Sequence, residues 1–530
     1  MPDRAAWKVL SAWTERLEPV TTESSHAWWA SNTDASPANS ARFQQALVAV
    51  EAASRDAEGF ARIERSLAEG VTDPRLRRAL EVLRTDLKPF QGPADARARL
   101  VELRAKVNER YANVRGTVAG KALGDNELVE ILKKSDDVSL REAAWKASKE
   151  VGAAVAADVR EMARQRNVVA RALGAADHYE LALLGQETQP AWLDAFLDRM
   201  DRATAPAFAR YKAALDGRLA ARFQVPADEL RPWHYEDPFF QEAPETGRAS
   251  FDRLFAGRDL VGLTTRTYDA LGLDVRPALE RSDLLPRGGK SQHAFCSHLD
   301  RKGDVRVLCN NVQNERWMGT MLHEFGHAIY DLSIDRELPW VLRKPPHTSS
   351  TEAIAMLFGR LSKDPTWLGT VLGLAPGDAR DVAAAASAIF SEGMLVFTRW
   401  VLVMARFERA MYRDPEQDLD TLWWDLVERY QGVRRPPGRK APDWAAKVHL
   451  AVAPVYYHAY LMGECIASQL SHAMRESTER GLVDNPGAGT FLRDRFFRPG
   501  SSTSWDRHLE QATGRPLDPG YFLADMGVAS

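Results

Sequence analysis

The stretch that decides the fold is residues 317–334, which read WMGTMLHEFGHAIYDLSI. Apolar residues recur in it at spacings of three and four, which predicts an α-helix with one buried stripe. Residues four apart share a helix face, so His323 and His327 can bind one ion from the same side. Glu324 lies about 100° further round the axis, which suits a general base beside a metal. The stretch therefore predicts the H-E-x-x-H zinc hydrolase motif; the simpler alternative is a core helix with two surface histidines.

A catalytic zinc site needs a third protein ligand and an open position for water. The sequence offers Glu352, within PPHTSSTEAIAM at residues 345–356. Two prolines end one element and the Thr/Ser run starts a helix, so we expect Glu352 in the first turn of that helix. Two alternatives stay open at this point. Glu352 could close a capping box with Ser349, and His347 could be the third ligand.

Composition argues against several classes of partner. The 530 residues carry 70 basic and 73 acidic side chains, a net charge of −3, so we expect neither nucleic acid nor an anionic membrane as partner. Three cysteines cannot form a full disulfide set, which favours a reducing compartment. No secretory signal and no run of about 20 uninterrupted apolar residues is apparent, which predicts a soluble, cytoplasmic protein.

Most of the chain has helical patterning. Residues 5–219 are rich in Ala, Leu, Glu and Arg with apolar spacings of three and four, and similar patterns return at 383–413 and 422–430. No internal repeat is apparent. The basic loop at 434–442 is expected to be solvated, or to steer anionic substrates. The aromatic, proline-bounded segment 231–240 reads as a structured loop used in packing or substrate contact.

One region predicts β-structure. Residues 292–296 and 305–309 resemble short strands, and residues 300–304 carry a turn signal between them. A small sheet just before the predicted zinc helix could hold an extended peptide on its edge strand. A hairpin that only braces the helix is the alternative.

Near the C-terminus, polar groups cluster along the chain. Lys447 and His449 precede Tyr457 and Tyr460, which are three residues apart and share a helix face. Buried core tyrosines are the usual interpretation of such a pair. A histidine and a tyrosine with free polar ends also stabilise the oxyanion formed when water attacks an amide.

Together these residues resemble the angiotensin-converting-enzyme family of zinc peptidyl-dipeptidases, in its small single-domain bacterial form. A more distant similarity is to the thimet oligopeptidase and oligoendopeptidase group. The resemblance implies a mainly α, elongated gluzincin fold with a deep central cleft and a small β-sheet beside the zinc helix. It also implies one peptidase domain over residues 1–530. In that domain 1–110 form a helical lid or wall, 285–365 the zinc-site core and 440–530 the C-terminal substrate-binding helices.

The resemblance assigns roles to individual residues. His323, His327 and Glu352 would bind Zn²⁺, and Glu324 would be the general base. His293 precedes His323 by 30 positions, the family's interval.

The remaining roles concern the substrate. His293 and Ala294 would hold the substrate backbone on an edge strand. Lys447 and Tyr457 match the lysine and tyrosine that bind the substrate's terminal carboxylate. His449 and Tyr460 match the pair that stabilises the tetrahedral intermediate.

The sequence also departs from the family pattern. One extra residue separates His449 from the tyrosines, so Tyr456 could take the role of Tyr457. Met356 stands where the family usually has an aspartate that supports the metal site, which would weaken that support. Ala459 stands where chloride-activated members carry an arginine, so chloride activation is not expected.

The family's carboxylate clamp also contains a glutamine, which has no clear counterpart here; only Tyr235 lies near the matching position. We therefore expect a zinc peptidase that acts on short peptides and releases C-terminal dipeptides. Three alternatives stay open: an oligoendopeptidase that cuts short peptides internally, a specialised peptidase for one peptide product, and an inactive zinc- or peptide-binding relative. The sequence does not define the oligomeric state.

Overall fold

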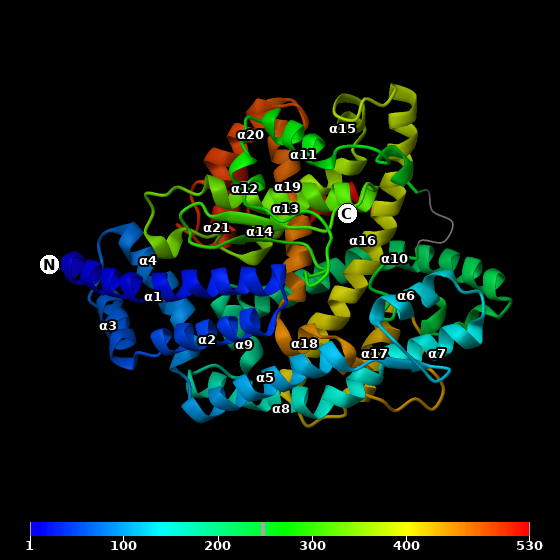
Figure 1. The fold of residues 1–530 in the computed structure, drawn as a ribbon, viewed down its shortest axis with the longest axis horizontal. Coiled ribbons are helices and arrows are strands. Elements are labelled where there is room, and N and C mark those ends of the chain that lie inside the picture. Colours follow the sequence, from blue (N-terminus) through cyan, green and yellow to red (C-terminus); the bar gives the residue numbers. More distant parts are fainter. Residues whose placement is uncertain (1, 245–249, 529–530) are drawn as a thin grey trace. The chain divides into compact units, whose positions relative to one another are not determined.

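The computed structural model describes residues 2–244 and 250–528. They fold mainly into helices, and their strands form two small two-stranded sheets (Figure 1). The predicted mainly α fold class is confirmed. The chain divides into two compact units, which we describe separately. Unit 1 comprises Met1–Gln91, Ala249–Ala386 and Met462–Phe522, and unit 2 comprises Gly92–Arg248, Ser387–Leu461 and Leu523–Ser530.

Unit 1 begins with four helices: α1 (Pro2–Thr33), α2 (Pro37–Ser54), α3 (Ala57–Ala68) and α4 (Pro74–Leu87). Helix α1 packs against the other three. The break between α1 and α2 has a local cause, because Ser36 caps α2 by accepting the N–H of Asn39, and Pro37 occupies the first turn.

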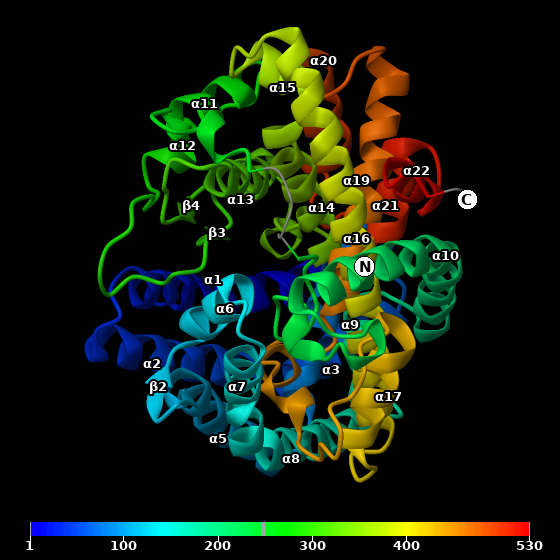
Figure 2. The same ribbon diagram turned by 90° about the vertical axis from the view of Figure 1, so that its right-hand side faces the viewer.

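The centre of unit 1 is helix α13 (Glu315–Ser333). It packs against α14 (Thr348–Gly359), α11 (Leu260–Asp269) and the antiparallel strands β3 (Phe295–His298) and β4 (Val305–Leu308) (Figure 2). The predicted small sheet beside this helix is therefore present. The turn between the strands forms because Asp300 accepts the N–H groups of Lys302 and Asp304.

Unit 1 contains several further short elements. They are η1 (Lys88–Gln91), η4 (Asp252–Leu254), α12 (Arg276–Leu279), η5 (Trp340–Leu342), η6 (Arg360–Lys363), α15 (Pro365–Thr370), α20 (Pro486–Phe491), η8 (Leu492–Phe497) and α21 (Trp505–Thr513). Helix α22 (Gly520–Asp525) ends the chain's helical part.

Unit 2 is also helical, with buried tryptophans such as Trp145, Trp400 and Trp444 in its core. Helix α5 (Ala94–Asn113) packs along α8 (Glu150–Ala172), and α8 packs on η7 (Asp443–Ala446). Its elements are α5 (Ala94–Asn113), β1 (Gly116–Val118), β2 (Lys121–Leu123), α6 (Asp125–Lys134), α7 (Val138–Ser148), α8 (Glu150–Ala172), α9 (His178–Gly185), α10 (Pro190–Phe223), η2 (Ala227–Glu229), η3 (Pro232–His234), α17 (Leu419–Gln431), η7 (Asp443–Ala446) and α18 (His449–Val452).

Three helices, α16 (Pro376–Arg413), α19 (Tyr457–Thr478) and α22, each contain a boundary between the units. Within the described residues, α16 is long and apolar enough to span a membrane by length and composition, with a mean hydropathy of 1.5 in its most apolar window. In that window 56% of the residues are buried inside the protein. Buried core helices pass the same test, so this is weak evidence for a span. The prediction of one peptidase domain over the whole chain stays a prediction.

Candidate metal centre and substrate-binding residues

Helix α13 presents two histidines from one face. It starts at Glu315 because the side chain of Asn314 accepts the N–H of Trp317, and it ends at Ser333, close to the predicted limits of 317–334. Its apolar stripe is buried, with Met318, Met321, Leu322, Phe325 and Ala328 all at 0% exposure. His323 and His327 lie four apart, beside that stripe, and their side chains keep 31% and 15% exposure.

Helix α14 carries Glu352, the third candidate ligand. The helix is capped by His347, whose Nδ1 accepts the N–H of Ser349 at 2.9 Å. The proposed capping box between Ser349 and Glu352 is therefore wrong, because that N–H already has a partner. Since the helix starts at Thr348, Glu352 lies in its second turn rather than in the predicted first turn.

Glycines allow the helices to approach closely around the site. A Cβ at Gly326 would lie 3.0 Å from the Cα of Ala355, so α13 and α14 nearly touch there. On α19, a Cβ at Gly463 would lie 3.2 Å from the Cβ of Glu352. These positions leave little room for a side chain, and they fix the distance between the elements that carry the three polar groups.

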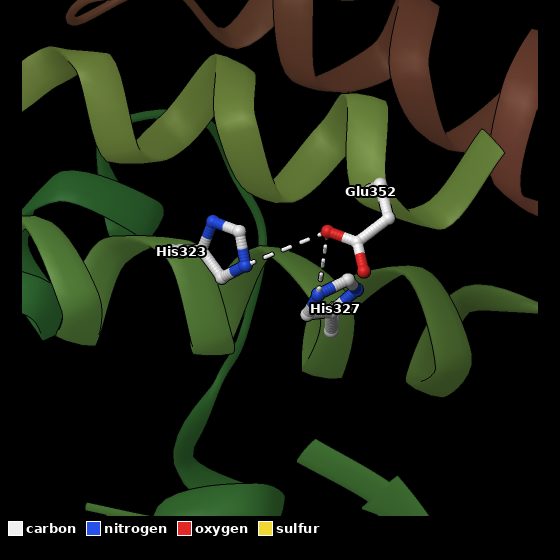
Figure 3. A group of neighbouring side chains, drawn as sticks. All are labelled: His323, His327 and Glu352. Atoms are coloured by element: carbon white, nitrogen blue, oxygen red, sulfur yellow. Dashed lines mark ion pairs between the residues drawn. The ribbon is translucent and has the colours of Figure 1, made fainter. Parts of the chain in front are cut away.

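The three groups converge (Figure 3). Oε2 of Glu352 lies 3.8 Å from Nε2 of His323 and 3.9 Å from Nε2 of His327, and all three candidate ligand atoms lie within 4.8 Å of one another. Tetrahedral zinc with bonds of about 2.1 Å separates its ligand atoms by about 3.4 Å, so small side-chain movements would complete the site. Within 2–244 and 250–528, no other group of three His, Cys, Asp or Glu side chains meets this test, and His347 is not part of it.

The protonation of the histidines suits a metal. Burial lowers the pKa of His323 to about 4, and burial together with His323 lowers the pKa of His327 well below its usual value. Both rings are therefore neutral at pH 7. Nδ1 of His327 lies 2.7 Å from Oγ1 of Thr351, and a proton on Nδ1 would leave the Nε2 lone pair facing Glu352. Sequence analysis missed this support from Thr351, although the residue directly precedes Glu352.

Glu324 lies beside these ligands and points towards β3. Its carboxylate accepts the backbone N–H of Cys296, and the residue is only 7% exposed. Burial, followed by the neighbouring Glu352 carboxylate, raises the pKa of Glu324 to about 8. Two carboxylates share this partly buried site. A divalent cation would compensate their charge, so the donor set fits a metal.

The residues before β3 differ from the prediction. The strand begins at Phe295, so His293 and Ala294 lie just before it rather than within a strand over 292–296. Strand β3 pairs with β4 on one edge, and among the described residues no strand pairs with its other edge. His293 is exposed next to that edge.

The other predicted substrate-binding residues belong to unit 2. The ammonium of Lys447 donates to Oε1 of Gln241 at 2.6 Å. It also lies about equally far from three ring centroids, at 5.4 Å from Phe239, 5.3 Å from Trp400 and 5.5 Å from Tyr457. Burial lowers the pKa of Lys447 to about 8, so the group is still largely cationic at pH 7.

Gln241 places a side-chain amide beside Lys447, where the sequence analysis found no clear counterpart of the family's glutamine. Tyr235, the candidate from the sequence, is 2% exposed, and its hydroxyl is bound to Lys212 and Asp216. The sequence signal that could have pointed to Gln241 is its location directly after the aromatic loop 231–240.

The structure also distinguishes the tyrosines. Tyr457 is the one beside Lys447, and its ring lies 4.9 Å from that of His449. Tyr456 instead packs on Tyr460, at 5.0 Å between centroids, and Tyr460 lies 5.8 Å from Tyr457. The arrangement therefore favours Tyr457 over Tyr456 as the partner of Lys447.

Comparisons with known proteins divide the chain into two matched parts. The profile of the family described as angiotensin-converting enzyme matches residues 2–200, and that of peptidase family M3 matches residues 278–528. The second range contains the H-E-x-x-H helix and Glu352. The chain is related to the ACE-like and M3 metallopeptidases. The resemblance inferred from the sequence is thus confirmed.

Two relatives illustrate how far the similarity extends. The chain is 27% identical over 176 residues to an inactive angiotensin-converting enzyme-related protein of Caenorhabditis elegans, covering 31% of this chain and 19% of the relative. It is 22% identical over 261 residues to thermostable carboxypeptidase 1 of Pyrococcus furiosus, covering 44% and 51%. The chain therefore spans about a fifth of the length of the first relative and about half of that of the second.

Proposed function

We propose that this metallopeptidase relative is a zinc-dependent peptidase that hydrolyses short peptides and releases dipeptides from their C-termini. The observation that carries the proposal is the convergence of His323, His327 and Glu352, with Glu324 beside them. A cytoplasmic location stays a prediction from the three cysteines, which are all free thiols.

The residues of unit 1 would supply the hydrolytic chemistry. His323, His327 and Glu352 would hold Zn²⁺, which when bound supplies a Lewis acid for the scissile carbonyl and for water. Glu324 would take the proton of the attacking water and return it to the leaving amine. The backbone at His293 and the open edge of β3 would hold the extended peptide.

The residues of unit 2 would bind the reacting peptide at two points. His449 and Tyr460 would stabilise the developing oxyanion by donating hydrogen bonds. Lys447, Gln241 and Tyr457, which we call the carboxylate clamp, would bind the free C-terminal carboxylate. A cation and an amide are suitable donors for that group, so the clamp supports cleavage near a free C-terminus over internal cleavage. The dipeptide length follows from the resemblance to the peptidyl-dipeptidases.

Internal cleavage of short peptides is the second candidate. The match of residues 278–528 to peptidase family M3 favours it, since this is the part of the chain that contains the candidate metal centre. A specialised peptidase for one peptide product and an inactive relative remain as further alternatives.

One digest tests these proposals together. The zinc-loaded protein is incubated with a decapeptide, and the products are identified by mass spectrometry while bound zinc is measured on the same sample. We expect one zinc per chain and stepwise loss of C-terminal dipeptides. Internal fragments would favour the oligopeptidase. A full complement of zinc without any products would refute a general peptidase for short peptides and favour the specialised or the inactive alternative.

A further inference from the structure

The loop that carries Gln241 has an unusual backbone. Glu236 and Phe240 have φ angles of 66° and 49°, in the left-handed region that non-glycine residues rarely occupy. Asp237 closes the loop by accepting the N–H groups of Phe239 and Gln241, each at 2.9 Å. Such a conformation persists only where the surrounding structure holds it, and unit 2 holds this one through three consecutive carbonyls.

Gln431 binds two of these carbonyls. It is the last residue of α17 and is 0% exposed. Its amide nitrogen donates to the carbonyl oxygens of Phe239 at 3.1 Å and Phe240 at 2.7 Å. Because both partners are acceptors, only the NH₂ group can face them. Gln431 therefore fixes the backbone up to the residue before Gln241.

Lys149 and Trp145 bind the third carbonyl, that of Pro238. Nζ of Lys149 donates to it at 2.7 Å and Nε1 of Trp145 at 3.0 Å. The Lys149 ammonium also lies 3.2 Å from the centroid of the Phe239 ring, and the residue is 4% exposed. Phe239 is also a ring beside Lys447, so Lys149 fixes part of the clamp's wall as well as the loop's backbone.

We infer that Gln431 and Lys149 are positioning residues that let the clamp distinguish a free carboxylate from a blocked C-terminus. Neither needs to touch the ligand: they hold residues 238–240 so that the Gln241 amide stays beside the Lys447 ammonium. Oε1 of Gln241 accepts from Lys447, and its amide nitrogen donates one N–H to Oδ2 of Asp237 at 3.4 Å. Because an amide NH₂ has two hydrogens, the second N–H stays a donor for the incoming carboxylate. The inference rests on the proposed function of the clamp.

The test measures binding, so that it does not depend on turnover. Calorimetry on the full zinc-loaded chain gives the Kd of alanyl-phenylalanine and of its C-terminal amide, which share every other group. We expect the free acid to bind at least about tenfold tighter, since hydrogen bonds to a charged group are at stake. Gln431→Glu places a carboxylate next to the carbonyl oxygens of Phe239 and Phe240, so the contact becomes repulsive. It should lower the ratio of the two Kd values most of the way to one. Gln431→Met and Lys149→Met remove donors without adding an oxygen and cover the case in which Gln431→Glu does not fold.

Gln469 in unit 1 gives a matched control. It is 1% exposed, and its amide nitrogen donates to the carbonyls of Arg515 and Pro516, each at 3.1 Å. Gln469→Glu should therefore disturb a comparable buried contact and leave the acid-to-amide ratio unchanged.

The inference is overturned if folded Gln431 and Lys149 variants keep the wild-type ratio of Kd values, which includes equally weaker binding of both dipeptides. It is also overturned if the wild type binds the acid and the amide equally well. Its failure can be told from failure of the proposed peptidase. Decapeptide hydrolysis without an acid preference would refute only the inference. A protein that hydrolyses nothing but prefers the free acid, with that preference lost in the Gln431 and Lys149 variants, would refute the peptidase and support the inference.

Discussion

The metal centre and the carboxylate clamp place polar groups by different means. In the metal centre, His323 and His327 are one helical turn apart and the third group comes from the adjacent helix α14, so regular geometry sets most distances. In the clamp, Lys447 and Gln241 are 206 positions apart, and an irregular loop must be held in place by buried side chains. The metal centre should therefore tolerate changes in its surroundings better than the clamp does, and changes within its own groups should affect it most.

The largest expected effect comes from the metal centre itself. Glu324→Gln should retain zinc and lower kcat by about 10²- to 10⁴-fold, because it removes a general base without removing a ligand. Bound zinc and kcat are measured on the same preparation. Glu315→Gln is the control on the same helix, since Glu315 pairs with Lys363 and Ser362, and it should keep full activity. Normal turnover in Glu324→Gln would exclude the mechanism.

The next effect contrasts the clamp with the metal centre. Lys447→Ala should lower kcat/KM by about 10- to 100-fold on peptides with a free C-terminus, because a charged hydrogen-bond donor to the carboxylate is lost. Amidated peptides should be affected far less, and zinc content should not change. Equal losses on free and amidated peptides would contradict the clamp.

This contrast also explains what could be predicted from the sequence. The periods of 3.6 and 2 residues are local properties, so the helix at 315–333, its two histidines and the hairpin turn were predictable from residue order. Contacts between distant segments have no such period. For that reason the sequence analysis did not find Gln241, which contacts Lys447, and offered only Tyr235 near the matching position. In the structure the hydroxyl of Tyr235 is instead bound to Lys212.

Local boundaries were less predictable than the elements themselves. The cap of α14 is His347 rather than Ser349, because a histidine Nδ1 can accept the same N–H that a hydroxyl would. The strand β3 begins at Phe295 because only from that residue on does the backbone pair with β4. The prediction of Glu352 as a candidate ligand did not depend on either boundary, since α14 packs against α13 and brings Glu352 to the two histidines.

A smaller effect tests the packing between α13 and α14. Gly326→Ala would place a Cβ 3.0 Å from the backbone of Ala355, so the helices must move apart. We expect a loss of about 1–3 kcal/mol in stability and weaker zinc binding, measured by thermal unfolding and by competition with a chelator. Gly319→Ala is the control, because its nearest neighbour is the Ser362 hydroxyl at 3.2 Å, a side chain that can rotate. Equal effects of both substitutions would argue against close packing at Gly326 as the determinant of the site.

The effect that is smallest for each pH unit is a pH dependence of stability that has opposite sign in the two units. In unit 1, burial lowers the pKa of His508 to about 4, below its unfolded value of about 6.5, so the unfolded state binds more protons between these values. The His508 contribution is present above pH 6.5 and is lost as the pH falls towards 4. In unit 2, burial raises the pKa of Glu408 to about 8, and the sign reverses: its contribution is present below about pH 4.5 and is lost as the pH rises towards 8.

Each group changes the free energy of unfolding by at most about 1.4 kcal/mol per pH unit. Hydrogen exchange read by mass spectrometry at pH 5, 7 and 9, corrected for the intrinsic rates, should therefore show opposite trends in two helices. Helix α21 should lose protection as the pH falls from 7 to 5, and the C-terminal part of α16, which carries Glu408, should lose it as the pH rises from 5 to 9. Glu408→Gln should remove most of the loss that α16 shows as the pH rises. It should leave the acid loss in α21 unchanged, because the pKa of His508 is set by burial and by its contact with Phe496. A parallel response of both helices in the wild type would mean that other groups dominate and that burial at these two positions does not set the pH range of each unit.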